Sequence, residues 1–329
     1  MREFPYRVAG AKKVRVILDT DCYCEADDQF AVAHALMSPK LDVVGICAEH
    51  YADRFGPDSE QQSYDEILHV LRLMGIPSAV SGEEEGAGIP VLHGCREAIP
   101  DEHTPRPSEA SRFIIREALK DDPRPLFITG QGALSNIASA YLEEPSIADR
   151  ITLVWIGGGS YPEGESEFNV ENDLNAANVI LSSKIELWQV PKNLYSRMYV
   201  PYSVLYEKVY PCGEIGKYLV ENLDRVSGIF YDWIRRPSYT PQAAAAAYPG
   251  GEMWIFGDQP AVGLILFDQR YSWHMQRAPR IDGNIRYVPG DDPDRMIRVY
   301  DEIDRDFIMD DFYAKLKYCF GTQEKGQEE

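Results

Sequence analysis

Carboxylate side chains gather near the start of the chain, where five of them fall within ten residues: Asp19, Asp21, Glu25, Asp27 and Asp28. Like charges at this spacing repel one another unless a cation or hydrogen-bond donors offset them. Several oxygen ligands of this kind suit a hard cation such as Ca²⁺ or Mg²⁺. The pattern therefore predicts a ligand site. The plainer alternative is a solvated acidic loop in which Asp27 caps the next helix.

Two cysteines, Cys22 and Cys24, lie inside this acidic stretch and have the C-x-C spacing of a zinc site. The sequence contains no second C-x-C or C-x-x-C motif, and the neighbouring side chains are carboxylates. A hard cation is therefore favoured over zinc. All six cysteines are scattered along the chain, and we expect them to be reduced thiols of a cytoplasmic protein.

Two later stretches carry weaker chemical signals. Gly157–Gly159 ends an apolar run, and glycines there allow a backbone or a ligand to approach closely. Glu167 and Asn169 follow, and their acceptor and donor groups suit the hydroxyls of a sugar. Farther along, Asp258 stands two residues before Pro260 at the start of an apolar helix, where a plain helix cap is the alternative to a ligand.

The elements that must position these groups alternate between apolar strands and helices. Val14–Asp19 (VRVILD) is a short β-branched run typical of a buried parallel strand, and it ends in the acidic stretch. This alternation indicates an α/β fold with an open, mostly parallel sheet flanked by helices and a Rossmann-like core. Ligand sites of such sheets form at the carboxyl ends of the strands. Further strands are expected at 42–48, 125–129, 151–156 and 185–190, and helices at 27–37, 64–74, 134–142 and 173–181.

The pattern changes after Pro201. We expect an aromatic-rich helical stretch at 202–236, strands within 270–303 and a closing helix at 304–320. Because the sequence has no internal repeat and no evident linker, it favours a single domain over 1–329, with a core at about 14–320 and a polar tail at 321–329.

The overall charge is acidic, because 33 Lys and Arg residues oppose 53 Asp and Glu residues for a formal net charge of −20. This balance argues against a nucleic-acid binder, which needs clustered cations, and against docking on an anionic membrane. No apolar run approaches the roughly 18 residues of a membrane span, and the first residues lack the apolar region of a secretory signal. We therefore expect a cytoplasmic protein whose partner is a small molecule.

Together, these motifs resemble the inosine–uridine nucleoside hydrolase family. The family pattern is an Asp-x-Asp…Asp-Asp cluster after a strand, a Gly-x-Leu-Thr-Asn-like turn, a Gly-Gly then Glu-Phe-Asn segment, and an Asp before an apolar helix. The first loop is similar in length to that of a bacterial subgroup. The matching residues here are Asp19, Asp21, Asp27 and Asp28; 132–136; 157–158 with 167–169; and Asp258.

The resemblance implies a nucleoside hydrolase-like fold and Ca²⁺-dependent hydrolysis of the N-glycosidic bond of a ribonucleoside or a related ribosyl compound. It implies Ca²⁺ ligands at Asp21, Asp28, Asp258 and the backbone carbonyl of Gln131. Asp21 would also be the base that takes a proton from the attacking water. Carboxylates around the ribose would stabilise its oxocarbenium-like transition state.

The same resemblance implies the contacts with the sugar. Asp27 and Asn169 would bind the 2′ and 3′ hydroxyls of the ribose, and Glu167 would face the 5′ hydroxyl. Asp19 would support the loop without touching the substrate. Because members of the family are usually oligomers, it also implies a homodimer or a homotetramer.

Several positions depart from the family pattern. Cys24, a candidate substrate contact, stands where the subgroup commonly has an Asn, and Tyr161 replaces a sugar-binding Asn. Gly257 replaces a His that precedes the last metal-binding Asp in well-characterised members. His50 is the nearest alternative acid for the leaving group, and His93 is another, although a single His is more often structural.

Aromatic side chains offer a further candidate feature. Tyr231, Trp233 and Tyr239 could line a lid that stacks on a base, and packing in the core is the plainer alternative.

Two other functions remain open. A non-catalytic ribosyl-binding protein of the same fold would account for Cys24, Tyr161 and Gly257. A haloacid dehalogenase-like phosphatase also has a strand ending in Asp-x-Asp, as at 19–21, with the first Asp as nucleophile. The further Asp expected four residues after Asp258 is Val262 here, which disfavours the phosphatase.

Overall fold

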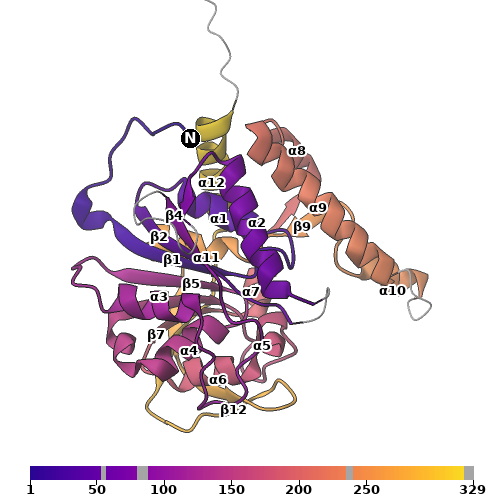
Figure 1. Cartoon of the computed structure of the whole chain (residues 1–329). Helices are drawn as coiled ribbons and strands as arrows, with labels where there is room; N and C mark the ends of the chain where they lie inside the picture. Colours follow the sequence, from indigo (N-terminus) through magenta and orange to yellow (C-terminus); the bar gives the residue numbers. More distant parts are fainter. Residues whose placement is uncertain (53–56, 80–87, 235–239, 322–329) are drawn as a thin grey trace, which may run out of the picture.

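The computed structural model describes residues 1–52, 57–79, 88–234 and 240–321, and of residues 233, 234 and 246 it describes the backbone only. A nine-stranded sheet lies at the centre of the part of the chain that it describes (Figure 1). Its order is β10-β13-β7-β6-β5-β1-β2-β4-β3, and all neighbours run parallel except β10 and β13. The predicted open, mostly parallel α/β sheet is therefore confirmed. Its strands are β1 (Val14–Thr20), β2 (Leu41–Ala48), β3 (Ser78–Ala79), β4 (Ile89–Leu92), β5 (Leu126–Gln131), β6 (Ile151–Ile156), β7 (Glu186–Val190), β10 (Trp273–Arg277) and β13 (Met296–Tyr300).

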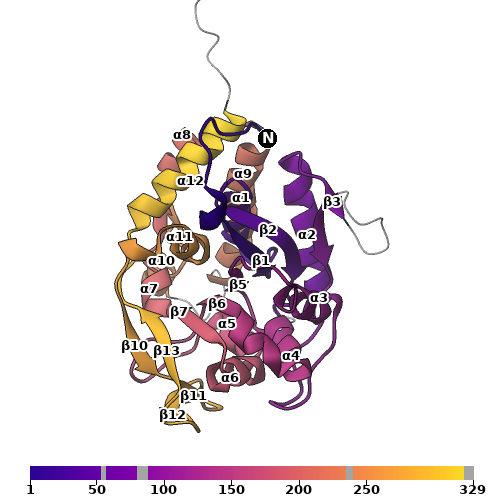
Figure 2. The same ribbon diagram turned by 90° about the vertical axis from the view of Figure 1, so that its left-hand side faces the viewer.

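Strand β1 runs between β2 and β5, and all of its residues are buried. Because successive side chains of a strand point to opposite faces, Val16 and Leu18 join one hydrophobic core and Ile17 joins the other. Helices lie on both sides of the sheet (Figure 2). The first core receives α1 (Asp28–Leu36), α2 (Ser59–Leu73), α9 (Gly213–Ile234), α11 (Gln259–Phe267) and α12 (Arg305–Phe320), and the second receives α3 (Glu109–Ala118), α4 (Ser135–Glu143) and α6 (Leu174–Ser182).

Short elements complete the described fold. Two antiparallel pairs lie outside the main sheet, β8 (Tyr199–Pro201) with β9 (Met253–Ile255) and β11 (Pro279–Ile281) with β12 (Tyr287–Pro289). The short helices are α5 (Phe168–Asn172), α7 (Lys192–Tyr195), α8 (Tyr202–Lys208) and α10 (Pro241–Ala246), and 3₁₀ turns span Gly10–Lys12, Pro145–Arg150 and Asp268–Arg270.

The stretch 202–236, predicted as helical, forms two helices as far as the structure describes it. Helix α8 ends at Lys208, and α9 begins at Gly213. Pro211 lacks an N–H group and cannot extend α8, and Gly213 adopts a left-handed φ of 67°. In the described ranges, no helix combines the length and apolar character that crossing a membrane requires.

The sequence-based prediction missed β4 and α3. Strand β4 has only four residues and includes Pro90, so its apolar pattern is too short to stand out. Helix α3 begins with a capping box, in which the Ser108 side chain accepts a hydrogen bond from the Ser111 N–H.

Candidate active site

A cavity of about 310 Å³ opens at the carboxyl ends of β1, β5 and β6. Loops and helix ends that are far apart in the sequence supply its walls, as expected for an open α/β sheet. Eight of the predicted site residues line it: Asp21, Cys24, Asp27, Asp28, Gln131, Glu167, Asn169 and Asp258. The other lining residues are Glu25, Ile156, Phe168, Lys192, Tyr195, Ser196, Tyr248, Ile255 and Gly257.

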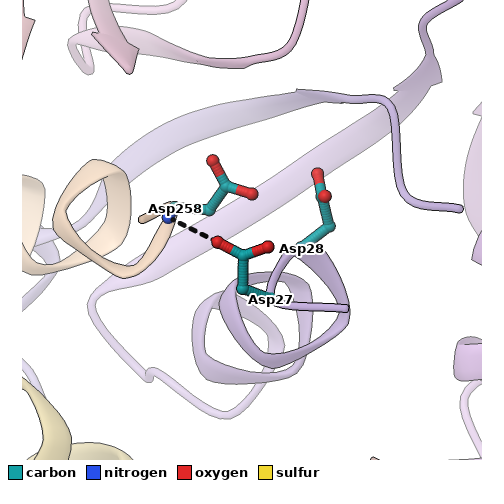
Figure 3. A group of neighbouring side chains, drawn as sticks. All are labelled: Asp27, Asp28 and Asp258. Atoms are coloured by element: carbon teal, nitrogen blue, oxygen red, sulfur yellow. Dashed lines mark hydrogen bonds between the residues drawn. The ribbon is translucent and has the colours of Figure 1, made fainter. Parts of the chain in front are cut away.

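Three of the lining carboxylates form a compact buried group. Asp27, Asp28 and Asp258 each place an oxygen within 4.8 Å of the other two (Figure 3). Asp27 and Asp28 lie at the start of α1, and Asp258 lies at the start of α11, which packs against α1. The backbone N–H of Asp258 donates to Asp27 Oδ2 over 3.2 Å, and the Thr20 hydroxyl donates to Asp28. The packing of α1 on α11 thus brings together carboxylates from opposite halves of the sequence.

The electrostatics of this group favour a bound cation. Burial, and then the charge of Asp27, raises the pKa of Asp28 to about 8, and burial raises the pKa of Asp27 to about 6. Burial, together with the neighbouring acids, raises the pKa values of Asp21 and Asp258 well above the usual range. A divalent cation among these groups would favour their ionised forms.

Asp21 provides a second indication that the residues fit a metal. The residue is 4% exposed, and its Oδ2 has no hydrogen-bond partner among the described residues. A buried, unpartnered carboxylate oxygen is costly unless a ligand meets it. The candidate metal ligands nearby are carboxylate oxygens, which suit a hard cation better than zinc. The three carboxylates whose oxygens lie within 4.8 Å of one another include Asp27 and not Asp21, although Asp21 is the predicted ligand and Asp27 the predicted sugar contact.

Glu167 and Asn169 lie at the start of α5, beside the Gly157–Gly159 break. Glu167 is 1% exposed, and burial raises the pKa of its carboxyl group although four donors contact it. Its Oε2 accepts from the N–H groups of Gly158 and Val170 over 3.0 and 3.1 Å. Gly158 has a left-handed φ of 82°, which a glycine adopts without strain. Asn169 is held by its amide, which donates to the carbonyl of Ile156 over 2.8 Å.

His50, predicted as a leaving-group acid, is not among the described residues that line the cavity. Its Nδ1 accepts from the Ala52 N–H over 3.3 Å, so the proton lies on Nε2. Nε2 is 2.7 Å from Ser135 Oγ, which in turn donates to Asp173 over 2.6 Å. Burial, and then the charge of Arg106, lowers the pKa of His50 to about 4. The imidazole is therefore neutral and engaged on both nitrogens.

The other histidine candidate and the lid residues lie elsewhere. His93 contacts Glu60 over 2.9 Å, outside the cavity lining. Tyr231 is half-buried on α9 and is not among the lining residues. The side chain of Trp233, and Tyr239 as a whole, lie outside the described part of the chain.

Sequence reasoning overlooked two tyrosines that line the cavity, Tyr195 and Tyr248. Tyr195 follows the carboxyl end of β7 by five residues, so the rule that sites form at strand ends could have identified it. Tyr248 follows the run of alanines at 243–247, and no pattern in the sequence points to it. Tyr161 donates to Gln189 over 2.8 Å and is not a lining residue.

Comparison with known sequences identifies a family for this chain and relatives named as nucleoside-cleaving enzymes. The profile of the family described as inosine-uridine preferring nucleoside hydrolase matches residues 16–282. The non-specific ribonucleoside hydrolase RihC of Salmonella newport is 29% identical, over 53% of this chain and 59% of that protein. Uridine nucleosidase 1 of Arabidopsis thaliana is 26% identical, over 57% of this chain and 59% of that protein. The chain thus matches less than two thirds of the length of these curated relatives.

Solved structures share the fold over nearly the whole chain. The plant nucleoside hydrolase PpNRh1 has a TM-score of 0.67 at 20% identity, covering 92% of this chain and 98% of that one. A purine-preferring ribonucleoside hydrolase from Gardnerella vaginalis has a TM-score of 0.70 at 19% identity, covering 93% and 98%. These matches confirm the predicted nucleoside hydrolase-like fold.

Proposed function

Because this chain belongs to the inosine-uridine preferring nucleoside hydrolase family, we propose that it hydrolyses the N-glycosidic bond of a ribonucleoside or a related ribosyl compound. One observation carries the proposal. The cavity at the strand ends is lined by the buried group of Asp27, Asp28 and Asp258, with the unpartnered oxygen of Asp21 beside it. Such a site can both bind a cation and stabilise positive charge on a sugar.

The side chains divide the chemistry among them. Asp21 Oδ2, which lacks a partner among the described residues, is the base that takes a proton from the attacking water. Asp27 and Asn169 bind the ribose hydroxyls and orient the sugar. As the glycosidic bond breaks, positive charge develops on the sugar, and the surrounding carboxylates stabilise it.

The proposed cation is Ca²⁺, with Asp21, Asp28, Asp258 and the Gln131 carbonyl as protein ligands. When bound, it would supply positive charge and Lewis acidity at the cavity. That charge would keep the carboxylate of Asp21 ionised, which its role as the base requires. The buried group of Asp27, Asp28 and Asp258 supports a hard cation, and a titration with Ca²⁺ and Mg²⁺ distinguishes the two metals.

The test is an assay of free ribose after the full chain is mixed with purine and pyrimidine nucleosides in Ca²⁺. We expect release of ribose that depends on Asp21. Absence of product from every nucleoside and ribosyl analogue, with metal binding shown by calorimetry, would overturn the proposal. Turnover of a generic aryl phosphate would instead favour a phosphatase, although Asp19, its required nucleophile, is fully buried and is not among the cavity-lining residues described.

A non-catalytic ribosyl-binding protein is the second candidate. The observation in its favour is that no histidine stands among the described residues of the cavity lining, where Gly257 precedes Asp258. Binding of ribose or a nucleoside without Asp21-dependent turnover would select this function. The leaving-group acid, the assembly into a homodimer or homotetramer and the cytoplasmic location stay predictions, and sedimentation of the purified chain tests the assembly.

A further inference from the structure

The hydrogen bonds of Glu167 leave its carboxylate no vacant acceptor position. A carboxylate offers about four acceptor sites, two on each oxygen. Oε2 accepts from the N–H groups of Gly158 and Val170, as described above. Oε1 accepts from the Asn169 N–H over 3.2 Å and from the Tyr195 hydroxyl over 2.9 Å. A substrate hydroxyl that approached Glu167 would have to displace one of these donors.

Tyr195 lies between this carboxylate and the group of buried aspartates. It is the last residue of α7, it lines the cavity, and it is half-buried, whereas Glu167 is almost completely covered. A Cβ atom placed on Gly257 would be 3.1 Å from Tyr195 Cδ2 and 3.5 Å from Asp27 Oδ2. The Tyr195 ring therefore fills the space beside Asp27 that a side chain at position 257 would occupy.

We propose that Tyr195, not Glu167, receives the 5′ hydroxyl of the ribosyl group, and that Glu167 is the positioning residue that orients the phenol from behind. This inference rests on the proposed function. The Tyr195 oxygen donates its proton to Glu167 and keeps its lone pairs as acceptors, so a sugar hydroxyl can donate to it. The chain of donors then runs from the sugar hydroxyl to Tyr195 and from Tyr195 to Glu167.

The arrangement also gives Gly257 a role. Because Tyr195 packs over it, a Cβ atom at this position would be tight against the ring, which would have to shift by a few tenths of an ångström. The glycine before the last metal-binding aspartate and the tyrosine on α7 therefore act as a pair. Tyr195 forms the wall of the sugar subsite in place of a residue at position 257.

The test pairs a side-chain change with a substrate change. We would measure kcat/KM for inosine and uridine and for their 5′-deoxy analogues with the wild type and Tyr195→Phe. In the wild type, loss of the 5′ hydroxyl is expected to lower kcat/KM by roughly threefold to tenfold, the range of one hydrogen bond. The ratio of interest is kcat/KM for a nucleoside divided by kcat/KM for its 5′-deoxy analogue. In Tyr195→Phe this ratio is expected to fall to about one, because the ring keeps its place but the acceptor is gone.

Two further variants separate a local effect from a general one. Gly257→Ala crowds the same ring and is expected to reduce the ratio in part, without adding to the effect of Tyr195→Phe. Tyr206→Phe is the matched control, because its exposed hydroxyl also donates to a carboxylate, Asp224, over 3.2 Å. That control is expected to keep the wild-type ratio, and an unchanged ratio in Tyr195→Phe would overturn the inference.

A binding measurement distinguishes failure of this inference from failure of the proposed hydrolysis. Calorimetry measures the Kd values of methyl β-D-ribofuranoside and its 5-deoxy analogue. The ratio of these two Kd values reports the same hydroxyl contact without requiring turnover. Lack of ribose release from every nucleoside would refute hydrolysis alone. Loss of the Kd ratio in Tyr195→Phe would still support the sugar contact, whereas an equal ratio in both proteins, or no binding of either sugar, would overturn it.

Discussion

Two regions near the strand ends contain buried carboxylates but satisfy them differently. In the Asp173 network, formed by His50, Ser135 and Asp173, the carboxylate accepts from the Ser135 hydroxyl and from the N–H groups of Ile99 and Ala176 over 2.6 to 2.9 Å. In the cavity, Asp21 Oδ2 has no such partner in the described structure. Burial raises the pKa of both groups, and neighbouring acids raise that of Asp21 further.

The difference separates a structural use of buried acid from a functional one. Donors around Asp173 are part of the chain, so the network is complete when the protein folds. The cavity acids repel one another, and a cation from solution would offset the repulsion that their few protein donors leave. Changes in the cavity should therefore alter catalysis and metal binding, whereas changes in the Asp173 network should alter the stability of the fold.

The largest effect is expected for Asp21→Asn. Loss of the base should lower kcat by at least about 100-fold, measured by release of ribose. Because the amide carries no charge, repulsion among the cavity acids falls, and the metal-free variant should unfold at a temperature no lower than the wild type. Activity within twofold of the wild type would contradict the assigned base.

Removal of the metal comes next. With Ca²⁺ at about 100 times its Kd, binding should stabilise the folded chain by about 2.7 kcal/mol, and a chelator should remove that gain in thermal unfolding. Asp258→Asn is expected to abolish the Ca²⁺-dependent shift, because it removes a carboxylate of the buried group. The shift should persist in Asp173→Ala, and its loss there would show that the two regions are not independent.

Asp173→Ala is expected to act on stability. It leaves the Ser135 hydroxyl and two backbone N–H groups without their acceptor, which should cost about 1–3 kcal/mol in the free energy of unfolding. Denaturant unfolding measures this cost. A cost below 0.5 kcal/mol would show that the network contributes little to the fold.

The smallest effect concerns pH. The pKa of His50 falls from an ordinary value of 6.5 to about 4 in the folded chain, so the unfolded state binds a proton between those values and the folded state does not. Stability from this group is therefore complete above pH 6.5 and declines as the pH falls towards 4, by about 1 kcal/mol at pH 5.5.

His50→Gln removes this dependence, so the comparison uses the difference between the two proteins. The groups that face His50 are Glu49, Asp173 through Ser135, and Arg106, and they are unchanged in the variant. Denaturant unfolding at pH 7.5 and 5.5 gives the result. An equal loss of stability in both proteins on acidification would show that His50 is not the responsible group.

Much of the fold could be predicted because its signals are local. The strands at 14–19 and 151–156 have continuous apolar runs, and the structure places strands at Val14–Thr20 and Ile151–Ile156. Strand β4 was missed because it is too short for its pattern to be distinctive. Helix α3 could have been found from Ser108, a residue type that commonly caps helix starts, and from the apolar residues on one face.

The candidate site also has features that the sequence shows and features that depend on distant contacts. The residue types and order of 19–28, 167–169 and Asp258 follow from the sequence, and their resemblance to one family could be recognised there. The engagement of His50 by Ser135 and Ala52 could not be anticipated, because it depends on a residue 85 positions away. The strand-end rule could have placed Tyr195 at the site, but not its hydrogen bond to a carboxylate 28 residues earlier.

The sequence by itself therefore determined the alternating strands and helices, the acids at the end of the first strand and the family. Only the tertiary structure decided which acids meet, because Asp258 and Asp27 are 231 residues apart and come together only when α11 packs on α1. It also decided that four donors, one of them the Tyr195 hydroxyl, meet the carboxylate of Glu167. Periodicity reports the conformation of neighbouring residues, whereas distances across the chain depend on how the cores pack.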